Sequence, residues 1–222
     1  MTPLGYNETV NSVKKIAEAD FPSRWGHFRI LGFEGYFTNT TPGYADDNPA
    51  DIDRRKESAV ALVMGDIHSQ PPLVRIHSQC LTGDVFGSLR CDCRAQLEMA
   101  LDKISKQKQG ILIYEDQEGR GIGLMAKLQA YALQDKGLDT VQANEKLGFK
   151  ADCREYNLPV AILKELGVTE IRLLSNNPEK VSAVERAGIK VVERVPADVG
   201  PHPHAERYLR TKREKMGHLS SR

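Results

Sequence analysis

Apolar residues along the chain occur in short runs that alternate with segments of helical periodicity. Runs rich in β-branched, aromatic and aliphatic residues, bounded by polar or glycine-containing turns, predict strands. These runs lie at 29–37, 58–64, 74–77, 111–115, 171–175 and 189–195. In the third run Val74 and Ile76 alternate with Arg75 and His77, so we expect a strand with one buried and one polar face.

Three segments show the three- and four-residue spacing of apolar positions that is typical of helices. They lie at 94–107, 124–134 and 178–187, the last opened by a proline and followed by a glycine. A further amphipathic helix is expected within residues 1–20, through VNSVKKIAEA. The order of elements predicts a single compact α/β domain over residues 1–222, with a mixed, largely parallel sheet and helices on both faces.

Two polar segments interrupt this pattern. Residues 38–57 are rich in Asn, Asp, Pro and Gly, with an acidic half before a basic half, and predict a solvated surface excursion. Residues 200–222 are basic and polar, which predicts a surface helix and tail.

The composition is that of an ordinary globular protein. Charged residues make up 27% of the chain, hydrophobic residues 40%, and the formal net charge is +1, so nothing calls for a nucleic acid or a membrane as partner. The longest apolar stretches, at 59–64 and 110–114, are far shorter than the ~20 residues of a membrane-spanning helix. The first twenty residues lack the uninterrupted apolar core of a secretion signal, and we expect a cytoplasmic protein.

Three of the four cysteines are clustered in the sequence. Cys80, Cys91 and Cys93 lie close together and Cys153 stands alone, which disfavours a disulfide framework. Two thiols two positions apart, joined by a third from a strand end, can bind zinc and leave one position for water, which favours a hydrolytic site. Two alternatives remain open: His77 could close a structural site with three cysteines and one histidine, or the thiols could be buried and unrelated.

A glycine-rich segment, QEGRGIG at 117–123, lies between a predicted strand and a predicted helix. Its glycines allow close approach of a ligand to the backbone, and the start of the following helix attracts anions. Glu118 could accept from a base edge, and Arg120 could meet a phosphate or a base. The spacing fits neither the dinucleotide-binding nor the P-loop pattern, so a plain tight turn explains the glycines equally well.

Several other positions have both a chemical and a structural interpretation. Asp152 and Arg154 project to one side of an extended segment and could address one substrate, or could form an ion pair at a helix entrance. Tyr131 shares a helical face with two leucines, which ordinarily indicates core. The SNNPEK segment at 175–180 could bind phosphate at a helix start, or could simply supply an N-cap.

Taken together, these segments resemble GTP cyclohydrolase II. The resemblance rests on RIHSQCLTGDVFGSLRCDC, YEDQEGRGIGL, LGFKADCREY and SNNPEK, and runs in one order from about Trp25 through Gly217. It implies zinc-dependent hydrolysis of GTP to a diaminopyrimidine ribosylamine phosphate, formate and pyrophosphate, the first step of riboflavin biosynthesis. It also implies magnesium bound with the triphosphate, and a homodimer.

The resemblance assigns roles to the matching residues. Zinc is expected at the three clustered cysteines. Asp152 is expected as the proton acceptor, Tyr131 as an assistant in ring opening, and Arg154 as the nucleophile at the α-phosphorus. Because a guanidinium is protonated at ordinary pH, stabilising phosphoryl charge is an easier role for Arg154. The expected GTP contacts are Arg75, Ile76, His77, Ser78, Gln79, Gln96, Glu118, Gly119, Arg120, Thr140, Ser175 and Lys180.

Three positions depart from the family pattern. Gln79 stands where glutamate is usual, Arg94 where glycine is common, and Cys153 where an acidic residue is expected. The lost carboxylate at 79 could alter recognition of the base or the ribose.

Three other functions compete with this one. A zinc nucleobase deaminase is disfavoured because its HxE and PCxxC motifs are missing. A family variant that stops at the formamide intermediate is disfavoured, by analogy, by the presence of Tyr131. A nucleotide-binding regulator with a structural zinc remains if His77 is a ligand.

Overall fold

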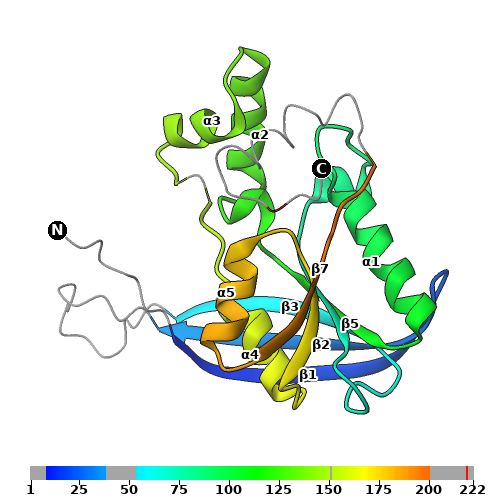
Figure 1. The fold of residues 1–222 in the computed structure, drawn as a ribbon. Coiled ribbons are helices and arrows are strands. Elements are labelled where there is room, and N and C mark those ends of the chain that lie inside the picture. The colour runs from blue at the N-terminus through cyan, green and yellow to red at the C-terminus, as the bar shows by residue number, and fades with distance from the viewer. Residues whose placement is uncertain (1–8, 39–53, 151, 201–218, 220–222) are drawn as a thin grey trace, which may run out of the picture.

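The fold is described from a computed structural model, which covers residues 9–38, 54–150, 152–200 and 219. Seven strands form one sheet in the order β1-β2-β3-β5-β4-β6-β7 (Figure 1). The strands are β1 Thr9–Ser23, β2 Gly26–Thr38, β3 Arg54–Met64, β4 Leu73–Ser78, β5 Gly110–Glu115, β6 Glu170–Leu174 and β7 Lys190–Val195. The helices are α1 Cys93–Gln107, α2 Leu124–Asp135, α3 Thr140–Lys146, α4 Asn157–Glu165 and α5 Pro178–Arg186, with a π-helical turn η1 at Leu81–Val85 and a 3₁₀ turn η2 at Glu118–Arg120.

The sheet has an antiparallel half and a parallel half. Strands β1, β2, β3 and β5 pair antiparallel in that order, whereas β5, β4, β6 and β7 pair parallel. The predicted mixed α/β sheet is confirmed. The parallel half matters most for the site, because loops after parallel strands open at the same edge.

Helices cover both faces of the sheet, as predicted. On one face α4 and α5 contribute Leu158, Ile162 and Val184 to a core with β2, β3 and the central strands. On the other face α1 contributes Leu101 and Ile104 to a second core. Figure 1 shows α4 and α5 together and α1 apart from them.

The prediction of an amphipathic helix within residues 1–20 is wrong. Residues from Thr9 onward form β1, which pairs with β2 along its length, and residues 1–8 lie outside the described part. Two register shifts, between Val10 and Ser12 and between Lys15 and Ala17, add residues to the strand. In the sequence, Val10, Val13 and Ile16 lie three positions apart, a spacing that imitates a helix.

Strand β4 is buried on both faces. The predicted alternation is present, since Val74 and Ile76 enter one core while Arg75 and His77 point to the opposite face. That second face is not solvated, however: Arg75 is 6% exposed and His77 is 2% exposed. A central parallel strand with helices on both sides has no solvent-facing side, so its polar residues must find buried partners.

The two polar segments fall mostly outside the described residues. Of the predicted excursion at 38–57, residue 38 ends β2 and residues 54–57 begin β3, and the rest is not described. The predicted C-terminal helix at 200–222 is likewise not described, apart from residues 200 and 219.

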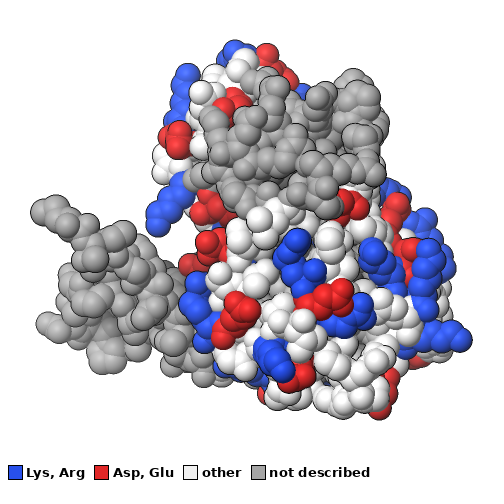
Figure 2. All heavy atoms as spheres, in the orientation of Figure 1, with Lys and Arg blue, Asp and Glu red and all other residues white. Residues whose placement is uncertain are grey.

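The described surface has a mixed charge pattern. Figure 2 shows positive and negative side chains interspersed over the face in view, in keeping with the net charge of +1. Every helix in the described segments is too short or too polar to cross a membrane.

Candidate active site

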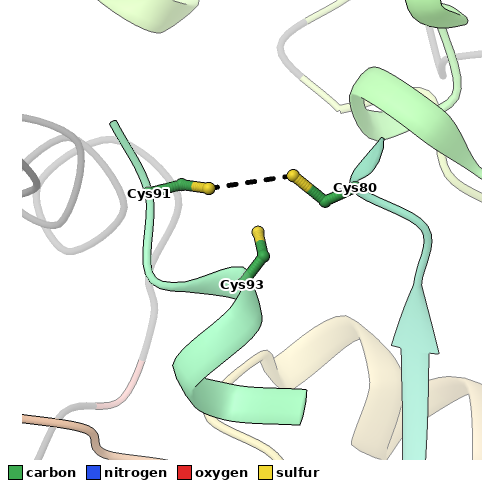
Figure 3. A group of neighbouring side chains, drawn as sticks. All are labelled: Cys80, Cys91 and Cys93. Carbon is green, nitrogen blue, oxygen red and sulfur yellow. Dashed lines mark hydrogen bonds between the residues drawn. The ribbon is translucent and has the colours of Figure 1, made fainter. Parts of the chain in front are cut away.

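The three clustered cysteines converge at the edge of the sheet where the parallel strands end. Cys80 follows β4, and Cys91 and Cys93 lie on either side of Asp92, the N-cap residue of α1. The three Sγ atoms lie within 4.8 Å of one another, and those of Cys80 and Cys91 are 3.7 Å apart (Figure 3). The sequence placed these thiols together correctly, and three sulfurs in this arrangement can hold one metal ion.

Gly83 leaves room for this convergence. A Cβ atom at position 83 would lie 3.0 Å from Sγ of Cys91 and 3.1 Å from Sγ of Cys80. The turn η1 therefore passes directly over the thiols, and any side chain there would press on two of them. The close fit of the backbone around Cys80, Cys91 and Cys93, the cysteine trio, supports a metal site at this place.

The electrostatics of the trio also suit a cation. Hydrogen bonds from Cys91 and Cys93 lower the pKa of Cys80 well below its ordinary value, so this thiol is the first to ionise. The same contact with Cys80 raises the pKa of Cys91 to about 11. A divalent ion would displace the remaining protons, because zinc binds cysteine as the thiolate.

Lys127 of α2 contacts the trio and was not identified from the sequence. Its Nζ donates to Sγ of Cys80 at 3.2 Å and to Oε1 of Glu118 at 2.7 Å. Burial lowers the pKa of Lys127, but the hydrogen bond to Glu118 and the charge of Cys80 outweigh burial and raise it above the usual value. The side chain is therefore a buried cation beside a candidate metal ligand.

His77 is engaged with a carboxylate beside the trio. Its Nε2 lies 3.2 Å from Oδ2 of Asp84, and its ring stacks on Tyr114 with centroids 5.5 Å apart. Asp84 also accepts from the backbone N–H of Cys80 at 3.0 Å and from the Tyr114 hydroxyl at 2.9 Å. Within the described residues, the group of possible metal ligands contains the three cysteines without His77, so the closed-site alternative is not favoured.

A chain of partly buried hydrogen bonds supports the turn that carries Cys91 and Cys93. Arg75 donates from Nη2 to Oε1 of Gln96 at 2.6 Å, and Gln96 donates from Nε2 to Oδ2 of Asp92 at 2.6 Å. Arg75 also donates from Nη1 to the carbonyl of Leu174 at 3.0 Å. The central strands thus hold the position of Asp92, between the two thiols.

The glycine-rich segment forms a tight loop against residues 152–154. Gly121 has a φ of +86°, and a Cβ atom there would lie 2.7 Å from the carbonyl oxygen of Cys153. The N–H of Cys153 donates to the carbonyl of Arg120 at 3.0 Å. The glycine is therefore required by a turn and by a close backbone approach, and the loop brings Arg154 to the site.

Asp152 and Arg154 form the ion pair that was the structural alternative for these residues. Nε of Arg154 lies 2.9 Å from Oδ1 of Asp152, and Nη2 lies 2.5 Å from Oδ2. Burial raises the pKa of Asp152, but hydrogen bonds and charge from Arg154 outweigh burial and lower it below its usual value. The ion pair is compatible with a catalytic role, because Arg154 also lines a pocket together with the three cysteines.

A pocket opens beside the thiols. Tyr131 lines it, with its hydroxyl 3.2 Å from Oγ1 of Thr82, so this tyrosine is not the core residue that its helical face suggested. Leu128 on the same face is 43% exposed. The pocket brings together the three predicted zinc ligands, two of the predicted catalytic residues and six of the predicted GTP contacts. These are Ser78, Gln79, Cys80, Cys91, Cys93, Glu118, Gly119, Arg120, Tyr131, Thr140 and Arg154.

A second pocket shares Ser78, Cys93 and Arg154 with the first. It collects the other predicted contacts that lie on the strand ends: Arg75, His77, Gln96, Ser175 and Lys180. Lys180 donates to the carbonyl of Ile76 at 2.8 Å, and burial lowers its pKa well below the usual value. Two adjoining pockets with common walls can accept the two ends of one elongated ligand.

Comparison with known proteins decides the family. The family model described as GTP cyclohydrolase II matches residues 14–196, which include all of the site just described. The chain belongs to the GTP cyclohydrolase II family. This confirms the resemblance, the enzyme class and the place in riboflavin biosynthesis.

Individual relatives agree with the family model. The chain is 51% identical over 208 residues to "GTP cyclohydrolase-2" of Escherichia coli O9:H4 (strain HS), covering 93% of this chain and 97% of that protein. The same figures hold for "GTP cyclohydrolase-2" of Shigella boydii serotype 18 (strain CDC 3083-94 / BS512). Among solved structures, a two domain 3,4-dihydroxy-2-butanone 4-phosphate synthase from A. baumannii matches with a TM-score of 0.38 and 16% identity, over 75% of this chain and 35% of that chain.

The departures from the GTP cyclohydrolase II pattern occupy different places. Gln79 lines the first pocket, and its N–H donates to the carbonyl of Glu115 at 2.9 Å, so it stays a candidate for altered recognition. Arg94 pairs with Glu98 on the exposed side of α1, 3.2 Å away. Cys153 lies behind the glycine-rich loop, with Sγ 3.9 Å from the carbonyl of Lys150.

Two predicted site residues lie outside the walls of both pockets. Ile76 is buried in the core, and its contribution to the site is the carbonyl that accepts from Lys180. Asp152 lies behind Arg154 as its ion-pair partner. Their predicted roles would therefore be exerted through Lys180 and Arg154.

Proposed function

We propose that this chain holds zinc at Cys80, Cys91 and Cys93 and hydrolyses GTP to formate, pyrophosphate and a diaminopyrimidine ribosylamine phosphate. The observation that carries the proposal is the shared pocket: the three thiols, Tyr131 and Arg154 line one cavity. A reaction at a purine carbon and a reaction at a phosphorus need the metal ligands and the arginine within reach of one nucleotide.

The donor set supports zinc in a hydrolytic role. Three thiolates at a strand end and a helix start are typical ligands for zinc, and a site with three protein ligands leaves one position open. When bound there, zinc supplies Lewis-acid activation of water for hydrolysis. The residues of the chain bind the nucleotide, orient it and carry protons.

We place the nucleotide across the two pockets. The purine lies in the first pocket with C8 toward the thiols, near Glu118 and Thr140, and the phosphates reach toward the second pocket. Arg154 belongs to both walls, and its guanidinium stabilises the charge that develops when the bond between the α and β phosphates breaks. Ser175 and Lys180 bind phosphate oxygens in the second pocket.

Asp152 and Tyr131 carry protons in this scheme. Asp152 is held ionised beside Arg154 and can accept a proton when the phosphate moves the guanidinium out of the pair. Tyr131, with its hydroxyl next to Thr82, lines the same pocket as the thiols and assists opening of the imidazole ring. Both assignments follow the family resemblance and the positions of the side chains.

The remaining partners extend the same proposal. Magnesium binds with the triphosphate and neutralises its charge, as in other phosphoryl transfers. The enzyme acts as a homodimer, as the family resemblance suggests. It works in the cytoplasm, where GTP is available and a reducing environment keeps unliganded cysteines as thiols.

The test is to incubate zinc-loaded protein with GTP and magnesium, and to follow formate and pyrophosphate separately. Release of both products at equal rates is expected. Pyrophosphate without formate would indicate the variant that stops at the formamide. Tight GTP binding with neither product would indicate the nucleotide-binding regulator and would contradict the proposal.

A further inference from the structure

Lys127 lies in the wall of the first pocket with its ammonium group against the cysteine trio. The residue is 8% exposed. Its Nζ lies 3.2 Å from Sγ of Cys80, 2.7 Å from Oε1 of Glu118 and 5.7 Å from the ring centroid of Tyr131. A buried cation that donates to a thiolate changes the electron density that this sulfur offers to a metal ion.

The charge of the trio shows why this contact matters. Three thiolates carry three negative charges, so a zinc ion bound to them leaves the cluster with a net negative charge. Strong donation from three sulfurs also weakens the Lewis acidity of the ion relative to imidazole ligands. A hydrogen bond from an ammonium group opposes both effects, because it withdraws density from one sulfur and supplies a positive charge.

We propose that Lys127 is a positioning residue of the metal centre, which donates to Cys80, weakens the donation of that sulfur and so makes the bound ion a stronger Lewis acid. This inference rests on the proposed zinc-dependent hydrolysis. It assigns a function to a side chain that neither the glycine-rich motif nor the cysteine motif contains.

Glu118 fixes Lys127 in this position. Its Oε1 accepts from Nζ of Lys127 and from the N–H of Gly119 at 2.9 Å, and its Oε2 accepts from the N–H of Leu81 at 2.7 Å. Leu81 directly follows Cys80, so one carboxylate ties together the backbone beside the ligand and the ammonium that contacts it. The hydrogen bonds of Glu118 are thus directed toward the metal centre.

The experiment uses cobalt(II) in place of zinc, because its sulfur-to-metal charge-transfer band reports the electron density on the thiolates. In Lys127→Met the band is expected at longer wavelength than in the unmodified protein, since the sulfur becomes more electron-rich. With zinc, kcat for formate release is expected to fall by about tenfold while KM for GTP stays close to its original value. Lys106→Met is the matched control, because Lys106 is an exposed lysine that pairs with Asp102 at 2.7 Å.

A second variant guards against loss of folding. Lys127→Met leaves the buried carboxylate of Glu118 without its cation, which can destabilise the protein. The double variant Lys127→Met with Glu118→Gln removes both charges together, and the same band shift is expected.

The proposal is overturned if either variant binds one cobalt per chain with an unmoved band, or if Lys127→Met keeps its full kcat with zinc. If the unmodified protein releases no formate but the band still shifts, the proposed hydrolysis fails and the tuning of the thiolate by Lys127 stands.

Discussion

The guanidinium of Arg154 lies along the carboxylate of Asp152, with Nη2 2.5 Å from Oδ2 and Nε 2.9 Å from Oδ1. The two residues are two positions apart, in a short segment held against the glycine-rich loop by the hydrogen bond from Cys153 to Arg120. Arg154 lines both pockets and Asp152 lines neither. The pair therefore links a group that can meet phosphate to a carboxylate that sets its position and can accept a proton.

The ionisation of Asp152 is expected to depend on Arg154. Burial favours the neutral carboxyl and Arg154 favours the charged one, and Arg154 prevails. In Arg154→Ala the pKa of Asp152 should therefore rise, which a carbon-detected NMR titration of the carboxyl group can measure. Because the folded-state pKa is lowered, the pair stabilises the fold above the usual aspartate pKa of 3.8, and this contribution is lost as pH falls through the lowered value.

A matched control for this titration is Arg90→Ala, since Arg90 is an exposed arginine that pairs with Asp135 at 2.6 Å. It should leave the pKa of Asp152 unchanged. An Asp152 pKa that stays low in Arg154→Ala would show that some other group holds the carboxylate ionised.

Arg154→Ala should suppress pyrophosphate release while zinc stays bound. Removal of one donor to a developing charge typically costs about 100-fold in rate, and a loss of this order is expected. Metal content by atomic emission and pyrophosphate by a coupled assay measure the two properties on one sample. Loss of zinc together with unaltered pyrophosphate release would reverse the assignment of Arg154.

Gly83→Ala should weaken metal binding. The new Cβ atom would press on the sulfurs of Cys80 and Cys91, at 3.1 and 3.0 Å. Zinc affinity, measured by competition with a chromophoric chelator, is expected to fall by about tenfold or more. Gly32→Ala is the control, because a Cβ atom there meets nothing within 4 Å. Equal affinities in the two variants would mean that the turn over the thiols can move freely.

Gln96→Leu should destabilise the fold. It breaks the chain from Arg75 to Asp92 and leaves buried polar groups without that partner, which costs about 1 to 3 kcal/mol for each group. Urea unfolding with metal-free protein separates this loss from any change in zinc binding. Gln107→Leu, at the end of α1 where the side chain accepts a solvent-exposed hydrogen bond from Arg172, should change stability by less than about 0.5 kcal/mol. Equal midpoints for the two variants would contradict the structural role of Gln96.

Much of the fold could be predicted from local patterns. Strands β3 to β7 and helices α1, α2 and α5 follow apolar runs and helical spacing, and the alternation of the two gives the parallel half of the sheet. Helices α3 at Thr140–Lys146 and α4 at Asn157–Glu165 were not predicted. Strand β1 could not be predicted in the same way, because its two bulges arise from pairing with β2, which is not visible in residues 9–23 alone. Tertiary pairing decided its conformation.

The part of the site that could be predicted is the part whose metal-binding residues lie close together in the sequence. A shared metal ion is indicated by the residue type of Cys80, Cys91 and Cys93 and by their position after a strand and before a helix. Lys127 was missed because one lysine in an amphipathic helix indicates solvent, and only the fold turns it toward Cys80. Gly83 was missed because its role is to leave space for atoms far from it in sequence.

The role of the three sulfurs is tested by comparing two cysteine variants for bound metal and formate release from GTP. Cys91→Ser removes a sulfur of the trio, whereas Cys153→Ser removes a cysteine outside it. Cys91→Ser is expected to lose zinc and formate release together, whereas Cys153→Ser is expected to keep one zinc per chain and its activity. Formate release from Cys91→Ser without bound metal would contradict the central claim that these three sulfurs hold the ion that the reaction requires.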